Sequence, residues 1–312
     1  MSDFPPARLG GEIDPDAWNF SRMGEDGPLP NPTGHTFPLL THDSDGRWRL
    51  VGTGFYVNDS GFFVTARHVV EDVLQNGEQI SPLVILHLHS PTGLFGPSES
   101  HLRPIMQCWL DDVADVALGV AAPATSIATG EIIKNWTWTL SWLVPPIGTL
   151  ASTYAFPNHT IIDNGRRFRF APHAYGGRID GFGDTRDALI MPFPYLQVGF
   201  RIHGAASGGP ILSGGHVIGI NCTELQENID HPPGPGFGAQ SRCVDGAFLD
   251  QIVLPGESTP RCVTFDELVR AGCINVANYT LRNPSDQPKG KLVQLHMRVT
   301  APLPAIEIEA YV

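Results

Sequence analysis

The stretch RIHGAASGGPIL, residues 201–212, places one serine, Ser207, inside a run of small residues. A hydrophobic segment, residues 216–220, follows it after a short turn. Small residues let the chain fold tightly, so that a side-chain hydroxyl and neighbouring backbone N–H groups can point at one spot. Serine alone is a weak nucleophile and needs a nearby base to take its proton. The stretch therefore predicts a reactive turn ahead of a β-strand, provided that the chain supplies a base.

The composition is typical of a β-rich protein with a large core. Of the 312 residues, 42% are hydrophobic and 17% are charged, which is enough apolar material for one large domain or two packed subdomains. The 34 glycines and 28 prolines follow no period, which favours many short strands joined by turns. Long apolar stripes at helical spacing are almost absent, so an all-α fold is disfavoured.

Charge, the N-terminal residues and cysteine spacing argue against several classes of protein, namely nucleic-acid-binding, secreted, membrane-spanning, disulfide-linked and zinc-binding proteins. The net charge of −12 argues against nucleic acid, because duplex binders need a basic surface. Residues 1–6, MSDFPP, lack the basic and apolar regions of a secretion signal, and no stretch reaches the roughly 18 apolar residues of a membrane span. The five cysteines have no CxxC spacing, which favours reduced thiols over a disulfide framework or zinc site. We expect a cytoplasmic protein with no membrane or nucleic-acid partner.

The pattern of strands and turns divides the chain into five predicted parts. These parts are an irregular N-terminal arm at 1–34, a first β region at 35–122, a crossover at 123–145, a second β region at 146–255 and a C-terminal extension at 256–312. In the extension, Thr264 and Glu267 form a capping box and Gly272 stands where a helix would end, so residues 265–271 are predicted to form one short helix. Two β-like segments follow it.

Two upstream residues could activate Ser207. His68 ends a predicted strand within VTARHV, residues 64–69, and Asp115 opens DVAL, residues 115–118, where a buried carboxylate would have to be paired. Asp111 and Asp112 also precede that strand and are alternatives to Asp115. A neutral imidazole that accepts the serine proton, and a carboxylate that orients the imidazole, are what acyl transfer by serine requires.

These motifs resemble those of the trypsin-like (chymotrypsin-fold) serine peptidases in their compact prokaryotic form. The shared patterns, which span about residues 35–255, are GTGF at 52–55, TARH at 65–68, DVAL at 115–118 and SGGP at 207–210. The resemblance implies an all-β fold of two six-stranded antiparallel β-barrels and a serine endopeptidase that acts on protein or peptide substrates without a cofactor. It makes His68 the general base and then acid, Asp115 its orienting group and Ser207 the nucleophile. Alternatives are an inactive binding module with this fold and an esterase that uses the same three residues.

Two alanines before Ser207 depart from the family pattern. The resemblance implies an oxyanion hole made by the backbone N–H groups of Ser207 and Ala205, where the family usually has glycine at the second position; Gly204 is the alternative donor. Ala206 stands where secreted members carry the aspartate that captures a newly cut N-terminus. Activation by that ion pair is excluded, so the site is either constitutively formed or switched by a regulatory protein partner, the arm or the extension.

The resemblance also indicates which residues select the substrate side chain before the cleaved bond, called P1. These are Arg201 and His203 ahead of the serine, and Cys222, Thr223 and Glu224 after it. Arg201 would favour an acidic P1 side chain, or it could instead point to solvent or pair with Glu224.

Three other residues have weaker functional interpretations. His87 and His89 share one strand face and could ligate a metal, but no third ligand is evident, so we interpret them as surface histidines and predict no metal site. Cys222 lacks a nucleophile motif and is interpreted as a small buried hydrophobe.

Overall fold

The computed structural model describes residues 34–89, 99–162, 167–189, 191–224, 235–245, 247–278, 292–298, 303–304 and 306–309. The predicted N-terminal arm lies outside these ranges except for residue 34. Within them, no helix is long and apolar enough to cross a membrane.

The first barrel is a closed, six-stranded antiparallel sheet. Its strands are β1 (Thr36–His42), β2 (Trp48–Tyr56), β3 (Phe62–Thr65), β6 (Val84–His89), β7 (Glu99–Leu110) and β8 (Ala117–Ala121). They pair in the order β7-β6-β1-β2-β3-β8, and β8 pairs with β7 to close the sheet. The helix α1 (Arg67–Glu71) and the small hairpin of β4 (Leu74–Gln75) and β5 (Glu78–Gln79) follow β3.

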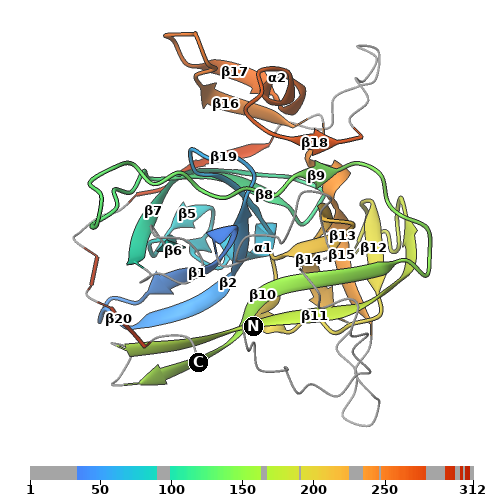
Figure 1. Ribbon diagram of the computed structural model, residues 1–312, viewed down its shortest axis with the longest axis horizontal. Coiled ribbons are helices and arrows are strands. Elements are labelled where there is room, and N and C mark those ends of the chain that lie inside the picture. Colours follow the sequence, from blue (N-terminus) through green and yellow to red (C-terminus); the bar gives the residue numbers. More distant parts are fainter. Residues whose placement is uncertain are drawn as a thin grey trace.

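The second barrel closes in the same way. Its strands are β10 (Leu150–Ile162), β11 (Arg167–Gly183), β12 (Tyr195–Val198), β13 (Pro210–Ser213), β14 (His216–Glu224) and β15 (Gly236–Gln240). They pair in the order β13-β10-β11-β12-β15-β14, and β13 pairs with β14. The short strand β9 (Leu140–Ser141) pairs in parallel with β14. The two barrels lie side by side in Figure 1 and confirm the predicted all-β architecture.

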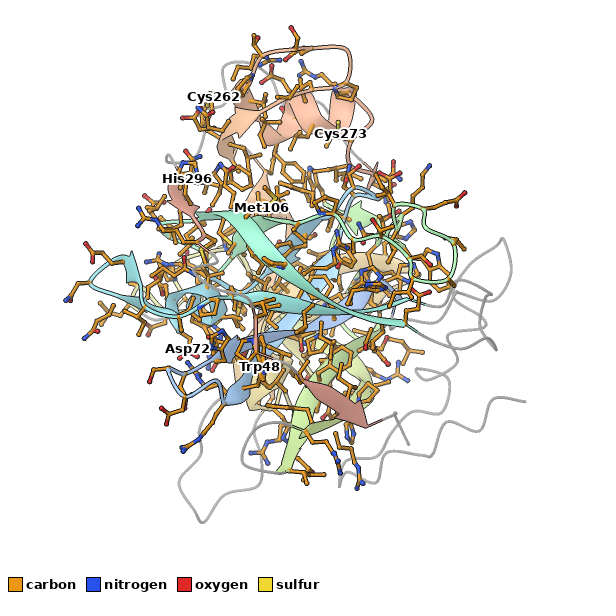
Figure 2. All side chains as sticks on the ribbon, turned by 90° about the vertical axis from the view of Figure 1, so that its left-hand side faces the viewer. Trp48, Asp72, Met106, Cys262, Cys273 and His296 are labelled. Carbon is orange, nitrogen blue, oxygen red and sulfur yellow. The ribbon has the colours of Figure 1, made fainter. Side chains whose placement is uncertain are left out.

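The C-terminal segment forms a small module and then returns to both barrels. The strands β16 (Phe248–Ile252) and β17 (Arg261–Thr264) pair with each other, and α2 (Phe265–Arg270) follows with the expected Thr264–Glu267 capping box. This module stands above the barrels in Figure 1, and Figure 2 shows Cys262 and Cys273 on it. Further along, β18 (Val276–Ala277) pairs with β9, β19 (Val293–His296) with β7, and β20 (Glu307–Glu309) with β11.

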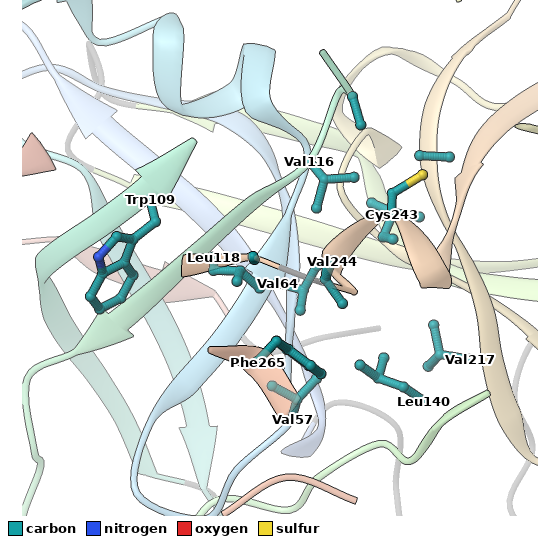
Figure 3. Packing of buried hydrophobic residues seen from close by; sticks show 14 of the residues in the cluster. Val57, Val64, Trp109, Val116, Leu118, Leu140, Val217, Cys243, Val244 and Phe265 are labelled. Atoms are coloured by element: carbon teal, nitrogen blue, oxygen red, sulfur yellow. The ribbon is translucent and has the colours of Figure 1, made fainter. Parts of the chain in front are cut away.

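One hydrophobic cluster joins the barrels and the module. It contains Val64 and Leu118 from the first barrel, Val217 from the second and Phe265 from α2. Figure 3 shows Val64 and Leu118 next to each other, Phe265 below them and Val217 towards the right, beside Leu140. Apolar contact of this kind stabilises the arrangement because it removes a large continuous surface from water. The two barrels are therefore held at one relative position, which a site between them requires.

A second cluster holds the long β10–β11 hairpin against the first barrel. Phe156 and Phe168 of the hairpin pack there with Trp48 and Leu86. Figure 1 shows the hairpin running from the second barrel beneath the first.

The interpretation of His87 as a surface residue is wrong. Its side chain is only 2% exposed, and its Nδ1 lies 3.0 Å from the hydroxyl of Tyr56 and 2.9 Å from a guanidinium nitrogen of Arg103. The side chain of His87 points into the closed barrel, where polar groups must hydrogen-bond to one another. The side chain of His89 lies outside the described residues.

Candidate active site

The end of β3 and the start of β8 bring His68 and Asp115 together. These strands pair antiparallel with Thr65 opposite Ala117. Residues just after Thr65 therefore lie at the same edge as residues just before Ala117. The chain leaves β3 into α1, whose Val69 and Val70 are buried, while the side chain of His68 stays 47% exposed.

His68 and Asp115 make two contacts. Oδ2 of Asp115 lies 2.8 Å from Nδ1 of His68, and Oδ1 accepts a 3.0 Å hydrogen bond from the backbone N–H of His68. The carboxylate of Asp111 accepts instead from the N–H groups of Val113 and Ala114, which shapes the turn before β8. Asp115, not Asp111, thus contacts the imidazole.

These contacts alter the acidity of both groups. Burial alone would lower the pKa of His68, but the hydrogen bond and negative charge of Asp115 outweigh it, so that the pKa lies above its usual value. Burial alone would raise the pKa of Asp115, but the bonds from His68 hold it below its usual value. Because Nδ1 is committed to the carboxylate, Nε2 is the ring nitrogen left to accept a proton.

Ser207 ends a single 3₁₀ turn between β12 and β13. The turn, η4 (Gly204–Ala206), begins after His203, and Ser207 follows it with 6% of its surface exposed. Its hydroxyl donates to the carbonyl of Cys222 at 3.0 Å. Among the described residues, no hydrogen bond joins this hydroxyl to His68. The structure thus pairs two of the three predicted catalytic side chains and keeps the serine in a separate bond.

One predicted oxyanion donor is occupied within η4. The N–H of Ser207 donates to the carbonyl of Gly204 at 3.2 Å, and that of Ala206 donates to His203 at 2.8 Å. Ala205 does not have a positive φ, so the alanine causes no backbone strain in this conformation. The carbonyl of Ala205 accepts a 2.8 Å hydrogen bond from the hydroxyl of Thr53 in the first barrel.

Gly208 allows the two barrels to approach at the serine. Its φ is +85°, and an added Cβ would overlap the carbonyl oxygen of Thr53 and the hydroxyl of Thr65. The N–H of Thr53 donates to the carbonyl of Ser207 at 2.8 Å. Glycine is required here both for backbone conformation and for space.

The predicted specificity residues lie around the same turn. Arg201 and Thr223 are exposed and His203 is half-buried, while the side chain of Glu224 lies outside the described residues. The thiol of Cys222 is buried 3.7 Å from the carbonyl of Asp115, and burial raises its pKa well above the usual value. The buried environment agrees with the interpretation of Cys222 as a hydrophobe.

Two further residues beside the turn carry no sequence motif. The ring of Tyr175 lies 5.5 Å from that of His203, and His173 stacks on Tyr175 at 5.9 Å with an interplanar angle of 17°. Both come from β11, far from Ser207 in sequence. In the described part of the chain, no group of three or more His, Cys, Asp or Glu side chains could hold a metal ion.

Comparisons with known proteins give likeness in structure alone. No family model and no curated protein matches the sequence. Solved structures similar to this chain include "Crystal structure of Deg5", 17% identical, with a TM-score of 0.47, covering 68% of this chain and 86% of that one. Another is "HtrA-type protease AlgWS227A with tripeptide", 16% identical, with a TM-score of 0.45, covering 68% of this chain and 57% of that one.

The topology itself decides the fold. Each sheet closes on itself through six antiparallel strands, and the segment with His68 and Asp115 comes from one barrel while Ser207 comes from the other. The chain therefore has the fold of the trypsin-like serine peptidases.

Proposed function

We propose that this protein is a serine endopeptidase that cleaves protein or peptide substrates through an acyl-enzyme intermediate. The observation that carries the proposal is the 2.8 Å contact between Asp115 and Nδ1 of His68, in a chain with this fold. A carboxylate at Nδ1 selects the tautomer that leaves Nε2 free, which is the requirement for a general base. Ser207 is the nucleophile, by its position in the SGGP motif.

In the reaction, the hydroxyl of Ser207 leaves the carbonyl of Cys222 and turns towards Nε2 of His68. His68 takes its proton as the oxygen attacks the substrate carbonyl, and Asp115 stabilises the imidazolium that forms. His68 then gives the proton to the leaving amine. Water repeats the sequence to release the acid, so the three side chains supply the whole acid–base chemistry and no cofactor is required.

The reaction also needs a rearrangement at η4. Donors for the oxyanion must point at the reacting oxygen, whereas the N–H of Ser207 is bonded to Gly204. Catalytic hydrogen bonds often form only when substrate is bound. We therefore place the formation of the oxyanion hole with substrate binding, or with a regulatory protein partner that favours the same rearrangement.

A second candidate is a binding module that holds a peptide without cutting it. The bond from Ser207 to Cys222 and the occupied N–H favour this candidate, because neither belongs to a reactive arrangement. An esterase that uses the same three residues is the remaining alternative.

Active-site labelling separates these candidates. A fluorophosphonate probe should label the wild-type protein and Ser213→Ala, but not Ser207→Ala. Ser213 is a matched control because the residue is as buried as Ser207 and its hydroxyl also donates to a carbonyl, that of Leu150. Absence of labelling in the wild type would support the binding module. Turnover of esters but not of casein would support the esterase, and unaided cleavage of casein would exclude the need for a partner.

A further inference from the structure

Four side chains next to η4 form a group that we call the donor cluster: His173, Tyr175, Arg201 and His203. The ring of Tyr175 lies beside that of His203, and the ring of His173 stacks with that of Tyr175. Phe200 and Ile202, the chain neighbours of Arg201, pack in the same hydrophobic cluster as Tyr175, so the backbone of Arg201 passes beside this group. Burial raises the pKa of Tyr175, and the positive charge of Arg201 acts against that rise. The cluster thus combines two imidazoles, a phenol and a guanidinium in one place.

The donor cluster is connected directly to the candidate nucleophile. His203 immediately precedes η4, and its carbonyl accepts the N–H of Ala206 at 2.8 Å. With a rise of about 2 Å per residue in a 3₁₀ turn, His203 lies roughly 8 Å from Ser207 along the chain.

The strand beneath the turn provides a second connection. Tyr175 stands opposite Thr153 in the β10–β11 ladder. The hydroxyl of Thr153 accepts a 2.8 Å hydrogen bond from the side-chain amide of Asn221, which also donates to the carbonyl of Ala206. Tyr175 and Ala206 further belong to the same hydrophobic cluster. The position of the donor cluster is therefore coupled to the turn that ends at Ser207.

Two polar atoms of the donor cluster have no hydrogen-bond partner in the described part of the chain. These are the hydroxyl of Tyr175, a residue that is 7% exposed, and Nδ1 of His173. Buried polar groups are nearly always satisfied, and those that are not often have a functional role. Phenylalanine would fill the same space without this cost. An unpaired phenol beside an imidazole is thus suited to donate to a ligand.

The charges around these atoms favour an anionic ligand. After burial, His203 acts on the pKa of His173 and Arg201 acts on the pKa of Tyr175, and each of these two groups can carry only a positive charge. Burial, followed by His203, lowers the pKa of His173, which favours the neutral imidazole, and that form carries one N–H to donate. A carboxylate accepts from phenol, imidazole and guanidinium alike, and hydrogen bonds to an ionised acceptor of this kind are the strong ones.

We propose that the donor cluster is the subsite for the P1 side chain and that it selects a carboxylate, so that the protein binds and cleaves after acidic residues. This inference rests on the proposed peptidase function for cleavage, but its recognition step does not depend on catalysis. It can therefore be tested by binding alone.

The experiment uses the full chain with Ser207→Ala, so that peptides bind without being cut. Three acetylated and amidated peptides differ only at P1, which is glutamate, glutamine or leucine, and their affinities are measured by fluorescence anisotropy. We expect the glutamate peptide to bind at least about tenfold more tightly than either of the others, because one hydrogen bond to a charged group usually contributes about this factor to affinity. Equal or undetectable binding of the three peptides overturns the proposal.

Second-site variants assign the preference to the donor cluster. Tyr175→Phe keeps the ring and its stacking, removes only the unpartnered hydroxyl and should reduce the preference for glutamate about tenfold without lowering the melting temperature. Arg201→Gln should reduce the preference for glutamate over glutamine. Tyr195 is a half-buried tyrosine of β12 that packs in a different cluster, so Tyr195→Phe is the matched control. This variant should change neither the preference for glutamate nor the melting temperature. A preference for glutamate that survives both Tyr175→Phe and Arg201→Gln also overturns the proposal.

Cleavage by the wild type distinguishes the two proposals. If Ser207 is labelled and peptides are cut after leucine as readily as after glutamate, the peptidase stands and the subsite proposal fails. If Ser207 is not labelled but the Ser207→Ala protein still prefers the glutamate peptide, the subsite proposal stands and the peptidase fails.

Discussion

Replacing Asp115 by asparagine tests the pairing on which the proposed reaction depends. The aspartate accepts two hydrogen bonds from His68, one at 2.8 Å from Nδ1 and one at 3.0 Å from the backbone N–H. An amide has one oxygen, so the asparagine side chain can keep only one of them. If its NH2 group faces Nδ1, the ring must carry its proton on Nε2, where it no longer accepts the proton of Ser207.

The expected loss follows from these two bonds. One hydrogen bond to a charged group contributes about 1.5–3 kcal/mol, which is roughly 10- to 150-fold in rate. The wrong tautomer in a triad lowers kcat by about 10⁴-fold. We expect kcat of Asp115→Asn to fall by at least about tenfold and by as much as about 10⁴-fold. Asp112→Asn, at an exposed position in the same loop, is the control and should be unaffected.

The titration of His68 gives a readout that does not depend on turnover. Asp115 is what holds the pKa of His68 above its usual value, against burial, which lowers it. In Asp115→Asn the pKa of His68 should therefore fall, and any rise of kcat/KM with pH should move to lower pH. NMR of isotope-labelled histidine in Ser207→Ala, with and without Asp115→Asn, measures this directly. An unchanged His68 titration would refute the reasoning.

Three further predictions concern stability. Gly208→Ala should lower the free energy of unfolding, measured in urea, by about 2–5 kcal/mol, because the added Cβ clashes and the positive φ is strained for alanine. The control, Gly214→Ala, has a φ of +56° but open space around it, and should lower the free energy of unfolding by only about 1–2 kcal/mol. Phe265→Ala should cost about 3–5 kcal/mol, because the side chain is fully buried in the shared cluster, whereas Leu189→Ala, at 91% exposure, should cost less than about 0.5 kcal/mol. Burial alone would raise the pKa of Glu99, but hydrogen bonds from two backbone N–H groups lower it to about 2. The stability that the ionised Glu99 contributes is therefore present above pH 4.5 and should be lost as the pH falls towards 2. In urea unfolding midpoints measured against pH, Glu99→Gln should make this loss smaller.

The sequence was most informative where a residue lies beside a strong β pattern. His68 and Asp115 each lie within three residues of a short hydrophobic strand, and the antiparallel pairing of those strands brings them to one edge. Alternation and turn residues predict such strands from local chemistry. The strands beside these two residues and the capped helix α2 could therefore be predicted from local patterns, whereas the two barrels and the pairing of His68 with Asp115 were predicted by the resemblance of the four motifs to a known family.

The donor cluster could not be predicted, because no local pattern carries it. His173 and Tyr175 lie within the 17-residue strand β11, and they reach His203 only through the register of β10 and β11 and the packing of the barrel. His87 shows the same difficulty, since closure of the barrel decides whether a strand face meets water. Long-range register and burial are properties of the whole sheet, and short motifs do not encode them.

Thr53 explains how the serine turn could rearrange without loosening the site. Its hydroxyl holds the carbonyl of Ala205, and its N–H holds the carbonyl of Ser207. Both of these bonds can persist if only the carbonyl of Gly204 rotates away from the N–H of Ser207. Gly204 is exposed and an added Cβ would meet nothing within 4 Å, so this one peptide unit has room to turn. The same rotation would turn the N–H of Ala205 to the side that the Gly204 carbonyl now occupies. An oxyanion hole made of Ala205 and Ser207 therefore requires one peptide to move, and the first barrel keeps the rest of the turn in place.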